Sequence, residues 1–416
     1  MVAISPNPST FADAKIQLKT ENGKRKTENF QKNYYLCEKV ARFFARHRAS
    51  GVRKFGLTYY IIIVAGALSA LALSSCGTVN RQQKQSDETI VKEQPQRLRL
   101  LFTGDAMCHT PQIASARCQD HSIDFRPSFE GVKRHFDRAD IAVVNFETTI
   151  STSSQYTGYP CFASPAEYAD ALAWLGTDVA LLANNHCCDK GRSGIHATIA
   201  KLDSLGIAHT GAFLNEEDRQ RNSILRFERN GIKLSLLNYT YGTNGNPIPK
   251  GCYVNLIDTL KMAQDIALAS EGADCVVACM HWGYEYQQKP AYIQRKLAQF
   301  LHRHGVGIVV GTHPHTVQPY TATERQITIY SLGNFVSNQR KGFTDGGLLA
   351  EIEIERGADS ICRYALRMVP IWVKVPGHNI ISSEFASEVE FTESQQADYK
   401  RFINNTDSLL NRGVKH

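Results

Sequence analysis

Residues 306–315 read VGIVVGTHPH, an apolar run that ends in two histidines on either side of Pro314. Four earlier runs have the same layout, in which an apolar stretch is followed by groups that can bind a metal. They are RLRLLFTGD (97–105), DIAVVNFE (140–147), DVALLANNH (178–186) and DCVVACMHWG (274–283). Short apolar runs bounded by polar or turn residues predict buried β-strands.

Helix-like segments separate these runs, at about 165–175, 191–205, 256–270 and 291–304. This alternation predicts an α/β architecture with a largely buried sheet. Residues 223–242 predict a β-hairpin, because Arg229-Asn230-Gly231 joins two alternating runs. Further strands are expected in ITIYSLGNFV (327–336), GLLAEIEIE (347–355) and RYALRMVPIWVKV (363–375), before a polar helical tail from about residue 383.

The five runs end in carboxylate, amide and imidazole side chains. In order these are Asp105, Glu147, Asn185 with His186, His281, and His313 with His315. In open α/β sheets the ligand crevice lies beyond the carboxyl ends of the strands, so five such ends in succession indicate one site. This ligand mixture suits one or two borderline divalent ions such as Zn, Mn or Fe. His186 follows a ligand amide directly, so it could face the substrate as a proton donor.

The net charge of +7 is local to the beginning of the chain. Residues 1–56 hold 12 Lys or Arg against 4 Asp or Glu, and the remainder holds 35 against 36. The body is therefore close to neutral, and its charge balance argues against nucleic-acid binding.

The segment that follows these basic residues has the layout of a secretion signal. Residues 57–75, LTYYIIIVAGALSALALSS, carry no charge and follow Arg53 and Lys54. The last residues before Cys76, Leu73-Ser74-Ser75, resemble a bacterial lipobox, so Cys76 is expected to be lipid-modified. A membrane-spanning helix is the alternative, since 19 uncharged residues are just long enough to cross a bilayer.

The predicted organisation has five segments. Residues 1–51 are expected to be a non-native extension, because signals normally begin near the start and no methionine lies between Met1 and Met107. Translation would then begin near Val52, and N-terminal sequencing of the precursor tests this start. The other segments are a signal (52–75), a polar tether (76–96), the main domain (97–345), and C-terminal strands with a helical tail (346–416).

Six motifs, in this order, resemble the CapA family of poly-gamma-glutamate capsule biosynthesis proteins. They are GDAM (104–107), NFE (145–147), ANNHCCDKG (183–191), HWGYE (281–285), GTHPH (311–315) and YSLGNFV (330–336). The resemblance implies a four-layer α/β/β/α sandwich like that of calcineurin-type metallophosphoesterases. It also implies that Asp105, Glu147, Asn185, His281, His313 and His315 are metal ligands and that His186 is the catalytic histidine.

Two motifs depart from the metallophosphoesterase pattern. An Asp-x-His pair is expected on the first strand, whereas Asp105 is followed by Ala106, Met107 and Cys108 before His109. The second motif usually reads Gly-Asp, and here the acid is Glu147. Both departures bear on how many metal positions are filled and on phosphoesterase activity.

Several neighbours of the ligands have open roles. Asp189 could cap the helix that begins near Gly191 or take part in the chemistry. Trp282 and Glu285 could line the crevice, with Glu285 orienting a ligand histidine, and Asn334 lies in a turn near the same rim.

The nine cysteines after residue 97 form no disulfide framework, because their number is odd and their spacing is not compact. Most of them are expected to be small buried hydrophobes rather than zinc ligands.

The predicted function is that of a lipid-anchored envelope protein of capsule synthesis or export, in the outer membrane if the cell has one. It would hydrolyse or transfer an anionic polymer such as poly-gamma-glutamate at its metal site, within a synthesis and export complex. A non-catalytic polymer-binding assembly factor and a metal-dependent envelope phosphoesterase are the alternatives, and fold analogy alone does not separate them.

Overall fold

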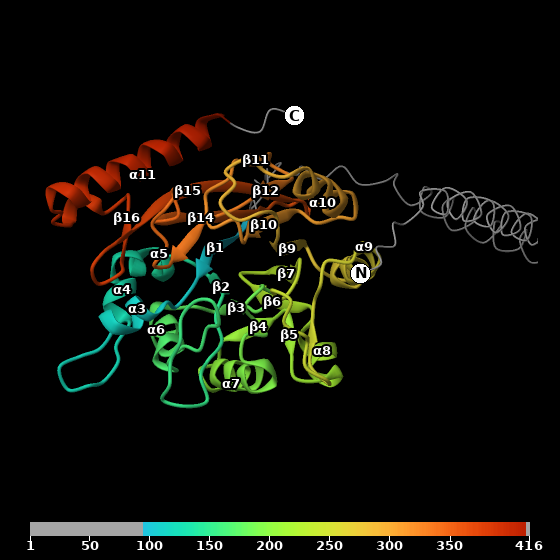
Figure 1. Ribbon diagram of the computed structural model, residues 1–416. Helices are drawn as coiled ribbons and strands as arrows, with labels where there is room; N and C mark the ends of the chain where they lie inside the picture. Colours follow the sequence, from blue (N-terminus) through green and yellow to red (C-terminus); the bar gives the residue numbers. More distant parts are fainter. Residues whose placement is uncertain (1–94, 413–416) are drawn as a thin grey trace, which may run out of the picture. The chain divides into compact units, whose positions relative to one another are not determined.

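The computed structural model describes residues 95–412 (Figure 1). The predicted signal, the lipidation site Cys76 and nearly all of the predicted tether lie outside these residues. Within residues 95–412, every helix is too short or too polar to cross a membrane.

The first sheet has eight strands with β1 near its middle. Its order is β16-β15-β14-β1-β2-β3-β4, and β13 pairs with the end of β1. β2, β3, β4 and β13 run parallel to β1, whereas β14 is antiparallel to it. The bounds are β1 Gln96–Ala106, β2 Ile141–Phe146, β3 Val179–Leu181, β4 Ala208–Thr210, β13 Asn334–Val336, β14 Gly346–Arg356, β15 Cys362–Lys374 and β16 Asn379–Ser382.

The second sheet has six strands in the order β11-β12-β10-β9-β7-β6. Its four inner strands are parallel, and the predicted hairpin supplies β6 and β7. The bounds are β6 Leu225–Arg229, β7 Ile232–Thr240, β9 Cys275–His281, β10 Ile308–Thr312, β11 Tyr320–Ala322 and β12 Ile327–Ile329. A small separate sheet pairs β5 (Ala212–Phe213) with β8 (Tyr253–Val254).

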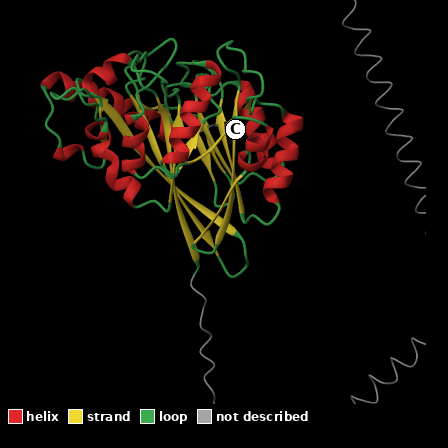
Figure 2. Cartoon of the chain, turned by 90° about the horizontal axis from the view of Figure 1, so that it is seen from below, coloured by secondary structure: helices red, strands yellow, loops and turns green. Residues whose placement is uncertain are grey.

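Helices cover the outer faces of both sheets (Figure 2). α3 to α7 pack on the first sheet, α9 and α10 pack on the second, and α11 lies along β15 (Figure 1). The bounds are α3 Thr110–Ser115, α4 Arg126–Phe129, α5 Lys133–Asp137, α6 Glu167–Leu175, α7 Gly191–Ser204, α8 Glu216–Asn222, α9 Thr259–Ser270, α10 Tyr292–Arg303 and α11 Glu393–Arg412.

Three apolar cores separate four layers. Alternate residues of β1 point to opposite cores, with Leu100 and Phe102 between the two sheets and Leu101 under the helices of the first sheet. In β9, Val277 likewise faces the space between the sheets, whereas Ala278 faces α9 and α10. This period-two alternation follows from strand geometry. The order helix, sheet, sheet, helix confirms the predicted α/β/β/α sandwich.

The elements agree closely with the sequence predictions where the apolar periodicity is strong. The four expected helices are α6, α7, α9 and α10, and the expected tail is α11. β14, β15 and β16 extend the sheet that contains β1. The short helices α3, α4 and α5, which connect β1 to β2, were not predicted.

Candidate metal centre

The parallel strands of both sheets bring their carboxyl ends together at one edge. In the first sheet, Asp105 of β1 is in register with Asn145 of β2 and with Asn334 of β13. In the second sheet, His281 of β9 is in register with Thr312 of β10. Ligand atoms of Asp105, Glu147 and His281 lie within 4.8 Å of one another, so the two sheets meet at a shared site.

Two fully buried carboxylates form the part of the site that belongs to the first sheet. The side-chain amide of Asn145 donates to Asp105 Oδ1 over 2.7 Å and lies 3.4 Å from Glu147 Oε2. The backbone N–H of His313 points at both oxygens of Asp105, each at 3.3 Å. Asp105 is therefore held by donors from both sheets.

His313 and His315 leave β10 in an unusual backbone conformation. Their φ angles are +96° and +57°, in the left-handed region that non-glycine residues rarely adopt. Such residues cost about 1–3 kcal/mol each and persist where the surrounding contacts hold them. Pro314 between them fixes the turn, and its carbonyl accepts from the N–H of Tyr286 over 2.8 Å. The strain is thus located at the predicted ligands.

The hydrogen bonds assign the proton of His315 to Nδ1. That atom lies 2.9 Å from Asp105 Oδ2 and 3.1 Å from Asn334 Oδ1, both of which are acceptors. Its Nε2 therefore carries the lone pair, and it lies 4.0 Å from Glu147 Oε1. Asn334 orients this imidazole by holding its opposite nitrogen.

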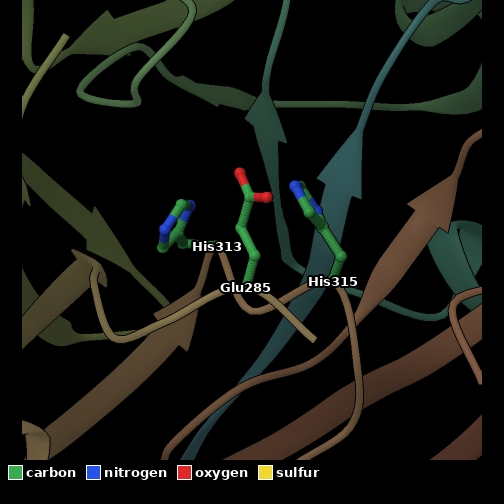
Figure 3. A group of neighbouring side chains, drawn as sticks. All are labelled: Glu285, His313 and His315. Carbon is green, nitrogen blue, oxygen red and sulfur yellow. The ribbon is translucent and has the colours of Figure 1, made fainter. Parts of the chain in front are cut away.

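A second group of ligand atoms joins His313 and His315 to Glu285, again within 4.8 Å of one another. Figure 3 shows the Glu285 carboxylate between the two imidazoles. Glu285 is exposed, whereas both histidines are buried. Glu285 is therefore close enough to both histidines to share a cation with them.

The electrostatics favour a bound cation. Burial, reinforced by the charge of Asp105, holds the pKa of Glu147 well above its ordinary value. Burial also lowers the pKa of His313 to about 3 and that of His281 well below its ordinary value, so both rings are neutral at neutral pH. For Asp105, burial acts to raise the pKa, but the hydrogen bond with His315, the charges of His315 and His281 and the contact with Glu147 together outweigh it, so the pKa is lowered. Carboxylates and neutral imidazoles are the forms that ligate metals, so a cation here would displace the proton that burial otherwise helps Glu147 to retain.

Three buried atoms at the centre have no hydrogen-bond partner: Asn145 Oδ1, Glu147 Oε1 and His313 Nδ1. An unpaired buried polar atom costs about 1–3 kcal/mol, and native proteins carry few of them. All three can present a lone pair to a cation. The residues therefore fit a divalent metal, held by Asp105, Glu147, His281, His313 and His315, with Asn185 beside them.

Asn185 and His186 reach the site from the loop after β3. The side-chain oxygen of Asn185 lies 2.7 Å from His281 Nε2, and its amide donates to Asn244 Oδ1 over 3.1 Å. His186 Nδ1 lies 2.8 Å from Asp189 Oδ2, and its Nε2 lies 3.4 Å from the amide nitrogen of Asn244. Asn244 thus contacts both Asn185, the predicted ligand, and His186, the predicted proton donor.

Two of the alternatives raised by the sequence are wrong. Asp189 does not cap α7, because the N-cap residue is Lys190 and it makes no side-chain cap. The Asp189 carboxylate instead accepts from the backbone N–H of Phe162 over 2.7 Å and holds His186. Trp282 does not line the crevice. It is buried in the core under α9 and α10, and its indole N–H donates to the Tyr330 carbonyl.

The sequence did not single out Asn145, Asn244 or Tyr241. Tyr241 is 46% exposed and its ring lies 4.4 Å from that of His313, so it borders the site. Tyr241 and Asn244 follow the end of β7, a further parallel strand of the second sheet. The pattern of residues 223–242 predicts a hairpin, and this prediction does not mark the end of β7 as part of the site. The signal was present, since TNGN (243–246) is rich in turn residues.

The nine cysteines of the described chain are all free. Cys275 and Cys279 point into the core between the sheets, and Cys187 and Cys188 lie in the core under the helices. These four are small buried hydrophobes, as predicted. Burial raises the pKa of Cys275 to about 12, which keeps it a thiol.

Comparison with known proteins adds sequence and structural relatives. Residues 99–339 match the family described as bacterial capsule synthesis protein PGA_cap, a span of more than half the chain. A capsule biosynthesis protein CapA of Bacillus anthracis is 26% identical over 325 residues, covering 75% of each chain. A PGA biosynthesis protein CapA of Bacillus subtilis is 26% identical over 55% of this chain and 61% of its own length. A phosphatase structure from Mycoplasma pneumoniae aligns with 66% of this chain and 94% of its own, at 14% identity and TM-score 0.42.

Proposed function

Because this chain belongs to the PGA_cap family of bacterial capsule synthesis proteins, we propose that it acts on an anionic polymer of the poly-gamma-glutamate type at a divalent-metal centre. The reaction would be hydrolysis of the polymer, or its transfer to an acceptor, during synthesis or export. Two relatives whose names refer to capsule or PGA biosynthesis support the choice of polymer.

One observation carries the proposal of chemistry at this centre. Two fully buried carboxylates and two neutral imidazoles meet here, and Glu147 Oε1, His313 Nδ1 and the neighbouring Asn145 Oδ1 are buried without hydrogen-bond partners. One or two ions of Mn, Zn or Fe bound there would supply a Lewis acid and lower the pKa of bound water. His315 and Asn185 would complete the ligand set, with Glu285 at the exposed side.

His186 is proposed to hold and deliver the proton. Its Nδ1 donates to the Asp189 carboxylate, so Nε2 has the lone pair that would take up a proton and deliver it to a leaving group. Asp189 would stabilise the imidazolium formed in that state, as the acid of a hydrolytic triad does. Asn244, which lies at Nε2 and at Asn185, would keep both side chains aligned.

Replacement of His186 tests this role. In His186→Ala, turnover of poly-gamma-glutamate should fall by about 100-fold or more, because a positioned general acid contributes about 10²–10⁴. Metal content, measured by elemental analysis, should stay at the wild-type level. The exposed His121 gives a matched control, and His121→Ala should retain full turnover. Unchanged turnover in His186→Ala would exclude His186 as the proton donor.

The same assays separate the alternative functions. A non-catalytic assembly factor would bind poly-gamma-glutamate without shortening it, even when loaded with metal. An envelope phosphoesterase would cleave small aryl phosphate esters and leave the polymer intact. Loss of metal from a His313→Ala/His315→Ala variant, beside a loaded wild-type chain, would establish the centre on which all three functions depend.

We also propose that the chain is anchored outside the cytoplasm by a lipid on Cys76, in the outer membrane if the cell has one. The lipobox-like sequence before Cys76 and its position after an uncharged run support this. Cells fed a labelled fatty acid should label the wild-type chain and not Cys76→Ala. Equal labelling of both would contradict the anchor.

A further inference from the structure

A groove of about 690 Å³ lies between α10 and two strands of the second sheet, β12 and the edge strand β11. Figure 1 shows where these elements lie. The helix side of the groove presents Arg295, Lys296 and Arg303, and its strand side presents Thr321, Thr323 and Gln326. We call this the basic groove. The lining contains three permanent cations and no carboxylate.

The absence of acids extends well beyond the lining. Residues 286–323, which include all of α10 and β10, contain no Asp or Glu. Glu324 lies just past this stretch and is directed toward Arg363, at 3.9 Å. On another surface, by contrast, Arg134 is paired with Glu388 and Arg138 with Glu384.

The three cations of the basic groove are available to a ligand. Across residues 95–412 none of them forms an ion pair with an acid, and Lys296 and Arg303 are exposed. Arg295 donates one N–H to the Pro290 carbonyl, which fixes its guanidinium at the groove. Lys296 lies over the ring of Tyr292, with its ammonium 5.4 Å from the ring centre. Lys296, Gln299 and Arg303 follow one another at helical spacing, so they form a continuous stripe.

One end of the basic groove, at the first turn of α10, is close to the loop that carries Glu285. α10 connects the parallel strands β9 and β10, so it runs antiparallel to them and begins at the edge where the metal centre lies. The loop before α10 is tied to the centre, because Tyr286 donates to the Pro314 carbonyl and Gln318 donates to the Gln287 carbonyl. From that edge the 12-residue helix extends for about 18 Å.

We propose that the basic groove is a second docking site for the anionic polymer, holding a carboxylate-bearing segment distant from the one at the metal centre. This docking site rests on the proposed function in one respect, because the ligand of the basic groove is the same polymer that is proposed to react at the metal centre. Exposed cations contribute little one at a time, so a ligand that meets several of them at once is favoured. A polymer with a carboxylate on every unit meets this requirement, and a single glutamate does not.

The test compares polymer binding in three full-length proteins, loaded with metal and kept in detergent. Labelled poly-gamma-glutamate is titrated in low and high salt, and Kd is read from fluorescence anisotropy. The groove variant is Arg295→Gln/Lys296→Gln/Arg303→Gln. The matched control, Arg117→Gln/Arg221→Gln/Lys400→Gln, removes three exposed cations elsewhere in the domain.

The groove variant should bind the polymer about tenfold more weakly than wild type, and its Kd should depend less steeply on salt. Metal content and melting temperature should match wild type in both variants, and the control should keep the wild-type Kd. If the triple variant melts early, Lys296→Gln/Arg303→Gln spares the bond from Arg295 to Pro290 and should still weaken binding.

The outcomes also separate this site from the metal centre. Unchanged affinity in the groove variants, or no polymer binding by wild type, would overturn the groove proposal. Equal affinity of the groove for a DNA oligonucleotide of the same charge would overturn its assignment to a carboxylate polymer. Weakened binding in the groove variant together with undiminished turnover in His313→Ala/His315→Ala would support the groove and contradict catalysis at the metal centre.

Discussion

Glu147 shows how a single residue can oppose folding until a ligand binds. Its Oε1 is buried without a hydrogen-bond partner, and burial beside Asp105 raises its pKa well above the ordinary 4.5. A raised carboxyl pKa means that the folded state retains a proton that the unfolded state has released. In the metal-free protein, stability should therefore fall as the pH rises above 4.5.

Replacing Glu147 by Gln should remove that penalty. At pH 8 and without metal, Glu147→Gln should unfold with a free energy roughly 1–3 kcal/mol higher than wild type, as measured in denaturant. The difference should shrink as the pH falls toward and below 4.5, because the unfolded wild-type chain then increasingly bears a neutral side chain, as the variant does at every pH. With metal present the order should reverse, because the variant has lost a ligand.

The exposed Glu217 provides the control, since Glu217→Gln should change little at any pH. A variant that is destabilised without metal, or whose difference from wild type does not depend on pH, would contradict this account of Glu147.

Single residues of the site were predictable from the sequence to the extent that they end apolar runs. Asp105, Glu147, His281, His313 and His315 do so, and the structure brings them together. Asn145 lies inside such a run, and its role depends on register with Asp105, which no local pattern specifies. Trp282 follows His281 directly but points to the opposite side of the second sheet, because alternate strand residues face opposite sides.

Among the elements, β1 packs against Gly333, the residue before β13, and leaves no room for a side chain at Gly104. A Cβ atom added at Gly104 would lie 1.9 Å from the Gly333 carbonyl oxygen and 2.8 Å from its carbon. Gly104 and Gly333 directly precede Asp105 and Asn334, which are paired between β1 and β13. Only glycine allows these two backbones to approach so closely.

Gly104→Ala should therefore push β13 away from β1. We expect a loss of roughly 1–3 kcal/mol in the free energy of unfolding, the usual range for an overpacked core. Metal affinity should fall as well, because Asn334 would no longer hold His315. Denaturant titration and metal titration measure the two effects.

Gly242→Ala is the matched substitution, since nothing lies within 4 Å of the added atom. It should leave both quantities near wild type. Wild-type metal affinity in Gly104→Ala would show that the spacing of β1 and β13 does not set the geometry of the site.

Element positions were predictable where periodicity was strong and loops were short. The segment between β1 and β2 was not, because α3, α4 and α5 have only 4 to 6 residues each, too short for an amphipathic period to emerge. The left-handed turn at His313 and His315 was also beyond prediction. Its conformation is held by contacts with Asp105, a residue 208 positions away in the sequence.

For the whole molecule, the candidate metal centre lies where the two sheets meet, beside the apolar core that they share. Asp105 and Glu147 come from the first sheet, whereas His281, His313 and His315 come from the second. Periodicity predicts strands but not the sheet to which each belongs, so the four layers followed from family resemblance and not from the residue pattern.

Metal should stabilise this assembly as any ligand of the native state does. A metal at 100 times its Kd should add about 2.7 kcal/mol to the free energy of unfolding. Melting curves of the full-length chain, recorded with chelator and then with added Mn, Zn or Fe, measure the shift. The variant His313→Ala/His315→Ala should show none, and an equal shift in both proteins would mean that the stabilising ion binds elsewhere.

Because β1 lies inside the first sheet, that sheet can be completed only after β14 has been synthesised. β1 lies between β2, which follows soon after it, and β14, whose Arg356 bonds to Gln96 from 260 residues further along the chain. A ribosome or secretion pore releases the amino end first, so β1 waits with one edge open until nearly the whole domain has emerged. His315 and Asn334 also emerge late, so an ion at the candidate centre would be captured only then. The metal supply of the compartment in which the domain is completed would then influence which ion is bound.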